Sequence, residues 1–130
     1  PIQVEAGLYA IGAVTPDSAL LLTTNFSLTY YTVEGEVEAS RVPAYIGVVD
    51  TEGTSVLTAF ASDKLNADNV TAFLNSDDVK AKVGHRKLIL PGYISVMSGS
   101  LHEESGWEVM VGPREASGIS KYLKTVWQGA

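Results

Sequence analysis

The sequence predicts an α/β fold in which a mostly parallel sheet is covered by helices on both faces. Strand-like runs such as 44–49 (AYIGVV) are apolar without polar alternation, which is typical of strands buried on both faces. Each such run is followed by a turn and then by apolar residues at helical spacing, and this unit occurs four times. Strand–loop–helix units joined by right-handed crossovers predict a Rossmann-like (flavodoxin-like) arrangement.

The expected strands are short and apolar: 7–12 as an N-terminal edge strand, then 19–23, 44–49, 87–90 and 107–111. The expected helices have apolar residues three or four positions apart: 26–39, a segment around 56–60, 66–74, 76–83, 94–101 and 119–127. The last of these has the clearest amphipathic pattern.

Helix starts are expected to be capped by short polar side chains. Thr24 or Asn25 would cap the helix 26–39, and Thr54 or Ser55 would cap the next one. Gly35 is expected to let the first helix fray beyond it, because glycine costs about 1 kcal/mol relative to alanine inside a helix.

The loops that follow the four parallel strands are the expected binding region. In a parallel sheet these loops share the carboxyl edge, and ligands bind near the point where the strand order reverses. The loops nominated in this way are 23–26, 50–54, 91–93 and 112–115.

The composition predicts one compact domain spanning residues 1–130. Its 45% hydrophobic and 18% charged residues are typical of a folded globular chain. A net charge of −6 argues against a nucleic-acid surface, and no apolar run is long enough to cross a membrane, so a cytoplasmic protein is expected. The start at Pro1 without methionine suggests an excised domain or a processed product.

Familiar catalytic and metal-binding motifs are missing. The chain has no phosphate-binding glycine loop and no G-x-S-x-G elbow, and without cysteine it cannot form disulfides, thiolate zinc sites or iron–sulfur ligands. His85 and His102 lack ligand spacing and are interpreted as surface side chains. We therefore predict no catalytic residues and no protein ligand for a metal.

A few other side chains could take part in binding. Arg114 could receive an anion, although an arginine in such a loop more often pairs with a neighbouring carboxylate. Tyr30 and Tyr31 could line a pocket, but aromatic residues at helical spacing are more often core. The scattered acidic residues are interpreted as a solvated face. The residues alone indicate a ligand-binding α/β domain without catalytic machinery.

Four segments carry a resemblance to a known family: 23–34 (TTNFSLTYYTVE), 50–53 (DTEG), 90–92 (LPG) and 111–114 (VGPR). In this order they resemble the C-terminal corrinoid-binding domain of the large (gamma) subunit of the corrinoid iron–sulfur protein. That protein belongs to the CO dehydrogenase/acetyl-CoA synthase system of anaerobes, and the resemblance extends from about Gly7 over nearly the whole chain.

The resemblance implies a cobalamin-type corrinoid that receives a methyl group from a methyl-tetrahydropterin and delivers it to acetyl-CoA synthase in the reductive acetyl-CoA pathway of carbon fixation. It implies as partners the small (delta) barrel subunit, a methyltransferase and acetyl-CoA synthase. The [4Fe-4S] and barrel domains of such a parent chain are missing from this sequence. The D-x-H-x-x-G loop of many B12 domains is also missing, so the cobalt is expected to have no protein histidine ligand.

The resemblance and the loop geometry together assign the cofactor-binding residues. The nucleotide tail or corrin edge is assigned to Thr23, Thr24, Asn25 and Phe26. The other walls are assigned to Gly53, Thr54, Pro91, Gly92, Gly112, Pro113 and Arg114. Two alternatives remain open: a cofactor-free docking module for a partner subunit, and an unrelated flavodoxin-like small-molecule binder.

Overall fold

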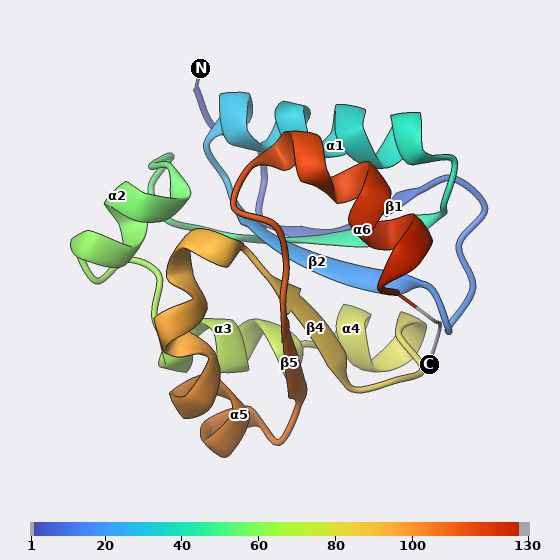
Figure 1. Cartoon of the computed structure of the whole chain (residues 1–130). Coiled ribbons are helices and arrows are strands. Elements are labelled where there is room, and N and C mark those ends of the chain that lie inside the picture. The colour runs from blue at the N-terminus through green and yellow to red at the C-terminus, as the bar shows by residue number, and fades with distance from the viewer. Residues whose placement is uncertain (1, 128–130) are drawn as a thin grey trace.

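A computed structural model describes residues 2–127 and shows one five-stranded sheet between two layers of helices (Figure 1). The strands, in chain order, are β1 Gly7–Ile11, β2 Ala19–Thr24, β3 Ala44–Val49, β4 Lys87–Leu90 and β5 Glu108–Val111. Their order in the sheet is β1-β3-β2-β4-β5, and all are parallel except β1, which runs antiparallel at one edge. The predicted α/β fold, with its short N-terminal edge strand, is confirmed.

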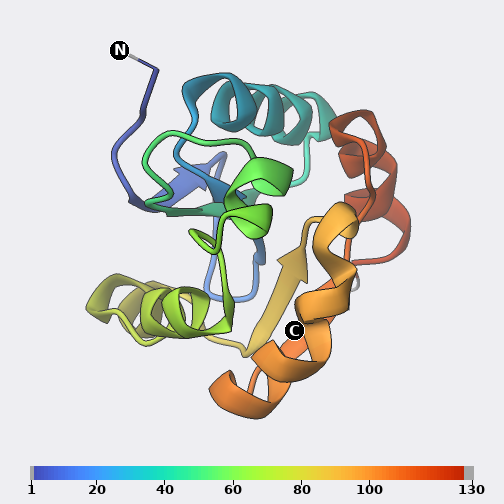
Figure 2. The same cartoon turned by 90° about the vertical axis from the view of Figure 1, so that its left-hand side faces the viewer.

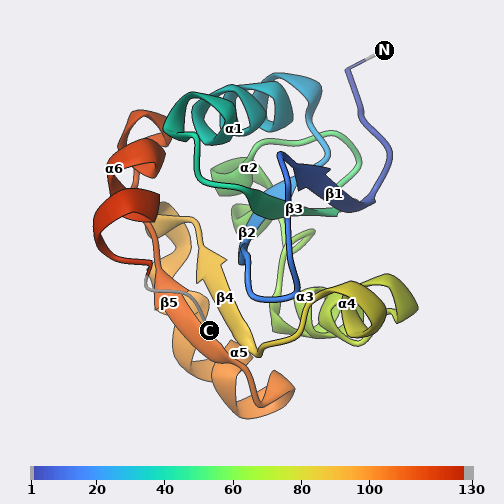
Figure 3. The same cartoon turned by 90° about the vertical axis from the view of Figure 1, so that its right-hand side faces the viewer.

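The helices divide between the two faces of the sheet (Figures 1 and 3). One face is covered by α1 Ser27–Ser40 and α6 Ile119–Thr125, and the other by α3 Ala67–Leu74, α4 Asp77–Lys82 and α5 Ser98–Ser105. Three further helices complete the fold: α2 Val56–Ala61 and the 3-10 helices η1 Gly92–Met97 and η2 Ala116–Gly118. Among the described residues, no helix is both long and apolar enough to span a membrane.

The central strand β2 explains why the strands read as continuous apolar runs. Leu20 and Leu22 pack into the core beneath α3 and α5, while Ala19 and Leu21 pack into the core beneath α1 and α6. Because successive side chains of a strand point to opposite faces, a strand covered on both sides presents apolar side chains to both layers, as residues 19–22 do.

The strand order reverses between β2 and β4. The chain passes from β2 through α1 to β3, and then returns across the other face to reach β4 on the far side of β2. At this point Leu21 pairs with Ile89. Figure 2 shows α2 (green) between α1 and the orange segment of η1 and α5, all of which begin after the carboxyl ends of strands. Open α/β sheets bind ligands in the crevice at such a reversal.

Two expectations about α1 are wrong. Phe26 occupies the N-cap position and no side chain caps the helix, because Thr24 still belongs to β2 and the Asn25 side chain bonds elsewhere. The helix also continues past Gly35, since its last turn buries Val37 against the sheet, and it ends at Ser40 with Arg41, whose φ is 62°, as the C-cap residue. Burial of the helix face outweighs the propensity cost of one glycine.

Other helix boundaries also differ in detail from the pattern-based expectation. Ser55 takes the N-cap position of α2 without making a side-chain cap bond, whereas Asn66 caps α3 through a reciprocal capping box with Asn69. The expected helix 94–101 is a 3-10 segment followed by α5, with a break at Ile94. The helix expected over 119–127 ends at Thr125.

Candidate functional site

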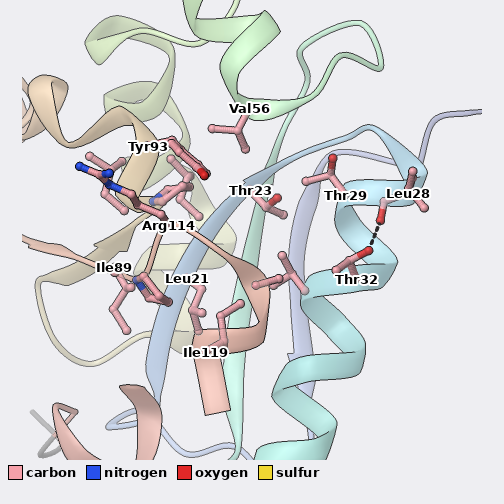
Figure 4. A pocket seen from close by; sticks show the side chains of 17 residues that line it. Leu21, Thr23, Leu28, Thr29, Thr32, Val56, Ile89, Tyr93, Arg114 and Ile119 are labelled. Carbon is pink, nitrogen blue, oxygen red and sulfur yellow. Dashed lines mark hydrogen bonds between the residues drawn. The ribbon is translucent and has the colours of Figure 1, made fainter. Parts of the chain in front are cut away.

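A cavity of about 270 Å³ opens at the carboxyl edge of the sheet, where β2 and β4 diverge (Figure 4). Its walls come from β2, the first turns of α1, α2, the segment after β4, and the loop from β5 into α6. Leu21, Ile89 and Ile119 provide apolar side chains deep in the fold, while Leu28 is exposed on the α1 side. The cavity therefore lies at the strand-order reversal where the topology predicts a ligand crevice.

The Thr23 side chain brings an unsatisfied polar group to this cavity. It is only 1% exposed, and its hydroxyl has no hydrogen-bond partner among the described residues. The hydroxyl of Thr32 is different, because it donates to the carbonyl of Leu28 at 2.7 Å. Figure 4 shows Thr23 between α1 and the wall that carries Tyr93. A buried hydroxyl without a partner costs about 1–3 kcal/mol. Among the described residues the hydroxyls of Thr24 and Thr71 are also buried without a partner, and only that of Thr23 belongs to a residue of the cavity lining.

The wall opposite α1 is held together by close backbone contacts. Gly112 N–H donates to Leu90 O at 2.8 Å, and Gly92 N–H donates to Pro113 O at 3.2 Å. A Cβ on Gly92 would lie 2.6 Å from the carbonyl oxygen of Gly112 and 2.8 Å from the amide nitrogen of Arg114. Only glycine allows the two segments to approach this closely.

Arg114 and Tyr93 form the exposed part of the same wall. The Arg114 guanidinium carbon lies 5.9 Å from the centre of the Tyr93 ring, and the Tyr93 hydroxyl donates to the Glu115 carboxylate. This hydrogen bond raises the pKa of the Tyr93 hydroxyl. Among the described residues Arg114 forms no ion pair, so the expectation that it pairs with a neighbouring carboxylate is wrong.

Asn25 has a structural role beside the cavity. Its side-chain oxygen accepts from the backbone N–H of Thr51 at 2.9 Å and of Gly53 at 3.0 Å, and its side-chain nitrogen donates to Asp50 at 3.1 Å. The 3% exposed amide thus ties the end of β2 to the turn after β3. These bonds explain why position 25 is an asparagine, since only an amide side chain offers both the acceptor for the two N–H groups and the donor for Asp50.

The N-terminal segment covers this junction. Val4 N–H donates to Asn25 O at 2.9 Å, and Gln3 forms an isolated antiparallel bridge with Phe26. The Gln3 side chain also lies against Gly53, where an added Cβ would be 2.7 Å from it. Phe26 and Gly53 therefore face the N-terminal segment.

The structure divides the eleven residues assigned to cofactor binding into two groups. Those that line the cavity are Thr23, Pro91, Gly112, Pro113 and Arg114. Those outside its lining are Thr24, Asn25, Phe26, Gly53, Thr54 and Gly92. Thr24, the last residue of β2, lies outside the lining although Leu21, Leu22 and Thr23 of the same strand belong to it, and Gly92 lies behind the wall that it holds together.

Sequence reasoning missed the contribution of α1 to the cavity. Leu28, Thr29, Thr32 and Val33 line it from the first turns of the helix. The spacing of these residues at positions 28, 29, 32 and 33 was a detectable signal, because residues three or four apart share one helix face. Neither Tyr30 nor Tyr31 lines the cavity. Tyr30 is core, at 2% exposure, and Tyr31 is exposed.

Neither histidine lies at the cavity. His85 has Nε2 2.7 Å from Ser18 O and accepts at Nδ1 from the Lys87 N–H at 3.1 Å. It is buried near Trp127, with ring centres 5.2 Å apart, so its interpretation as a surface side chain is wrong. His102 bonds to the carbonyl of the buried Trp107. Within residues 2–127, no group of three or more histidine or acidic side chains is placed to hold a metal ion.

Comparison with known proteins identifies the family. The family model described as CO dehydrogenase/acetyl-CoA synthase delta subunit matches residues 1–123. The chain belongs to the CO dehydrogenase/acetyl-CoA synthase delta subunit family. Because the match covers nearly the whole chain, the cavity and its walls lie within the matched region.

Individual members of this system are similar to the chain over nearly its full length. It is 49% identical over 124 residues to the corrinoid/iron–sulfur protein large subunit of Moorella thermoacetica, covering 95% of this chain and 28% of that protein. It is 42% identical over 123 residues to the acetyl-CoA decarbonylase/synthase complex subunit gamma of Methanothermobacter thermautotrophicus, covering 95% of this chain and 27% of that protein. The chain therefore spans little more than a quarter of the length of these relatives.

The family match corrects the subunit assignment made from the sequence. The chain was expected to be the C-terminal corrinoid-binding domain of the large (gamma) subunit. The matching family model is instead that of the delta subunit. The relatives named as large or gamma subunits are covered over only 28% and 27% of their lengths. The prediction that the chain comes from the CO dehydrogenase/acetyl-CoA synthase system is confirmed, whereas its placement in the gamma subunit is wrong.

Proposed function

We propose that the chain is a corrinoid-binding, methyl-carrying domain of the CO dehydrogenase/acetyl-CoA synthase system. The observation that carries the proposal is the apolar cavity at the strand-order reversal, whose inner wall holds the unpartnered Thr23 hydroxyl. Largely apolar pockets with a few convergent polar groups are typical of small-molecule and cofactor sites. Membership of a family from this system supports a corrinoid as the ligand.

The size of the cavity indicates how a corrinoid would bind. A cavity of about 270 Å³ is slightly smaller than ordinary ligand pockets, which are roughly 300–1,000 Å³. A macrocycle would therefore place one side group in the cavity and lie across its mouth. The rim suits this arrangement, because Leu28 and Tyr93 are 67% and 46% exposed there.

The chemistry of the lining is compatible with such a cofactor. A bound corrinoid would supply a cobalt centre that accepts a methyl group and passes it on. Leu21, Ile89 and Ile119 would exclude water from the inserted group, and Thr23 would gain a hydrogen-bond partner. Neither histidine belongs to the lining, and the proposal includes a cobalt without a protein histidine ligand.

The proposal includes the donor, the acceptor and the partners. The methyl group would come from a methyl-tetrahydropterin and pass to acetyl-CoA synthase, so the partners would be a methyltransferase, acetyl-CoA synthase and another subunit of the corrinoid protein. Residues 1–130 would act as a single domain. Any [4Fe-4S] cluster of the assembly would be ligated outside these residues, because they contain no cysteine.

Binding of hydroxocobalamin by the apo chain tests the proposal. We expect a shift in its visible absorbance and comigration of the corrinoid with the protein on gel filtration. Thr29→Trp should abolish both by filling the cavity, whereas Ala72→Trp, on the exposed side of α3, should bind like the wild type. A wild-type chain that leaves the corrinoid spectrum unchanged and does not comigrate with it would refute the proposal and favour a cofactor-free docking module.

A further inference from the structure

The cavity has a single charged side chain in its lining. Of the lining residues, which all lie in the described part of the chain, only Arg114 is ionised at neutral pH. The chain as a whole carries a net charge of −6, so this positive side chain at the cavity is opposite in sign to the net charge of the protein. Arg114 is exposed at the rim, so its guanidinium is accessible to an anion at the mouth of the cavity.

The Arg114 guanidinium forms no ion pair with any of the described residues. Glu115 follows Arg114 in the sequence and is its natural counter-ion, yet no ion pair forms between them. The Glu115 carboxylate instead accepts the hydroxyl of Tyr93, while the Arg114 guanidinium lies over the Tyr93 ring. The Tyr93 hydroxyl thus binds the Glu115 carboxylate, and the Tyr93 ring packs against the Arg114 guanidinium.

We propose that Arg114 recognises an anionic group of the bound ligand and that Tyr93 is a positioning residue that keeps Arg114 available by holding Glu115. This inference rests on the proposed function. For a corrinoid, the anionic group is the phosphodiester that joins the macrocycle to its nucleotide base. Arginine suits this role because its planar guanidinium can donate two parallel hydrogen bonds to a phosphate.

The first experiment compares two corrinoids. Hydroxocobalamin contains the phosphodiester, and dicyanocobinamide lacks it together with the base. We expect Arg114→Gln to weaken hydroxocobalamin binding about five- to tenfold, the range expected of one partly exposed charge-assisted contact, and to change cobinamide binding less than about twofold. Lys121→Gln, on the exposed side of α6, is the control and should change neither.

The second experiment tests the role of Tyr93. Tyr93→Phe keeps the ring but frees the Glu115 carboxylate to pair with Arg114, so hydroxocobalamin affinity should fall about threefold. Adding Glu115→Gln removes the competing charge and should restore the affinity. If Tyr93 only packed against the ligand, the second substitution would give no such rescue.

The outcomes separate this inference from the proposed function. If the wild type binds hydroxocobalamin but Arg114→Gln weakens both corrinoids equally or neither, the anion role of Arg114 is refuted while the corrinoid site stands. Failure of rescue in the double variant refutes the positioning role of Tyr93. If the wild type binds neither corrinoid, the proposed function and this inference are both overturned.

Discussion

Replacing Thr23 by valine should make this domain more stable while weakening its binding of the ligand. Valine has nearly the same shape as threonine but lacks the hydroxyl, which is buried and unpartnered at the cavity wall. Since an unsatisfied buried hydroxyl costs about 1–3 kcal/mol, the free energy of unfolding should rise by about 1 kcal/mol, or about 4 °C in Tm for a chain of this length. Hydroxocobalamin affinity should fall about fivefold, because the ligand loses one hydrogen bond.

Thr24→Val is the matched control for this substitution. The Thr24 hydroxyl is also buried and unpartnered, but Thr24 is not part of the cavity lining. Urea unfolding should show a similar gain in stability for both variants, and absorbance titration with hydroxocobalamin should show weaker binding only for Thr23→Val. Equal affinity of the wild type and Thr23→Val would refute the ligand contact. A loss of stability would show that the hydroxyl has a partner.

Two further predictions concern the support of the site and the response of the fold to pH. Asn25→Ala should lower the free energy of unfolding by about 3 kcal/mol, because the N–H groups of Thr51 and Gly53 lose their buried acceptor; a change below about 1 kcal/mol in urea unfolding would contradict this. Burial, followed by the hydrogen bond to Glu34, raises the pKa of Tyr30 above its usual value of 10.0, so the folded state retains a proton that the unfolded chain releases. The free energy of unfolding should therefore not depend on this group below about pH 10 and should fall as the pH rises further. The fall should be shallower in Tyr30→Phe. Identical slopes of unfolding free energy against pH for the two proteins between about pH 9 and 11.5 would contradict the assignment.

The sequence by itself predicted the elements and their connection. The expected strands 19–23 and 44–49 contain apolar residues on both strand faces, and the residues after them repeat at helical spacing, so the strand–loop–helix order follows from local periodicity. The rule that parallel strands share a carboxyl edge then placed Thr23, Pro91 and Arg114 near one another. These inferences succeeded because they need only the chain direction and the side-chain period.

Local pattern was a poor guide to hydrogen-bond partners. Asn25 has the right chemistry and position for a helix cap, yet its amide bonds to the turn after β3, about 25 residues along the chain. Gly35 lowers helix propensity, but burial of Val37 extends the helix beyond it. In both cases the competing interaction comes from a segment distant in sequence, which no window of neighbouring residues reveals.

The tertiary structure alone decided which edge residues surround the cavity. Thr23 and Thr24 are chemically alike, and only the strand's pairing in the sheet and its helical cover determine that the first lines the cavity. The side chain of Gln3 covers Gly53, so Gly53 lies outside the cavity lining. The hydroxyl of Tyr93 donates to the carboxylate of Glu115, and the neighbouring Arg114 keeps an unpaired charge. The periodicity of side chains is a local property of the sequence, whereas coverage and pairing at a sheet edge depend on segments that meet only when the whole chain folds.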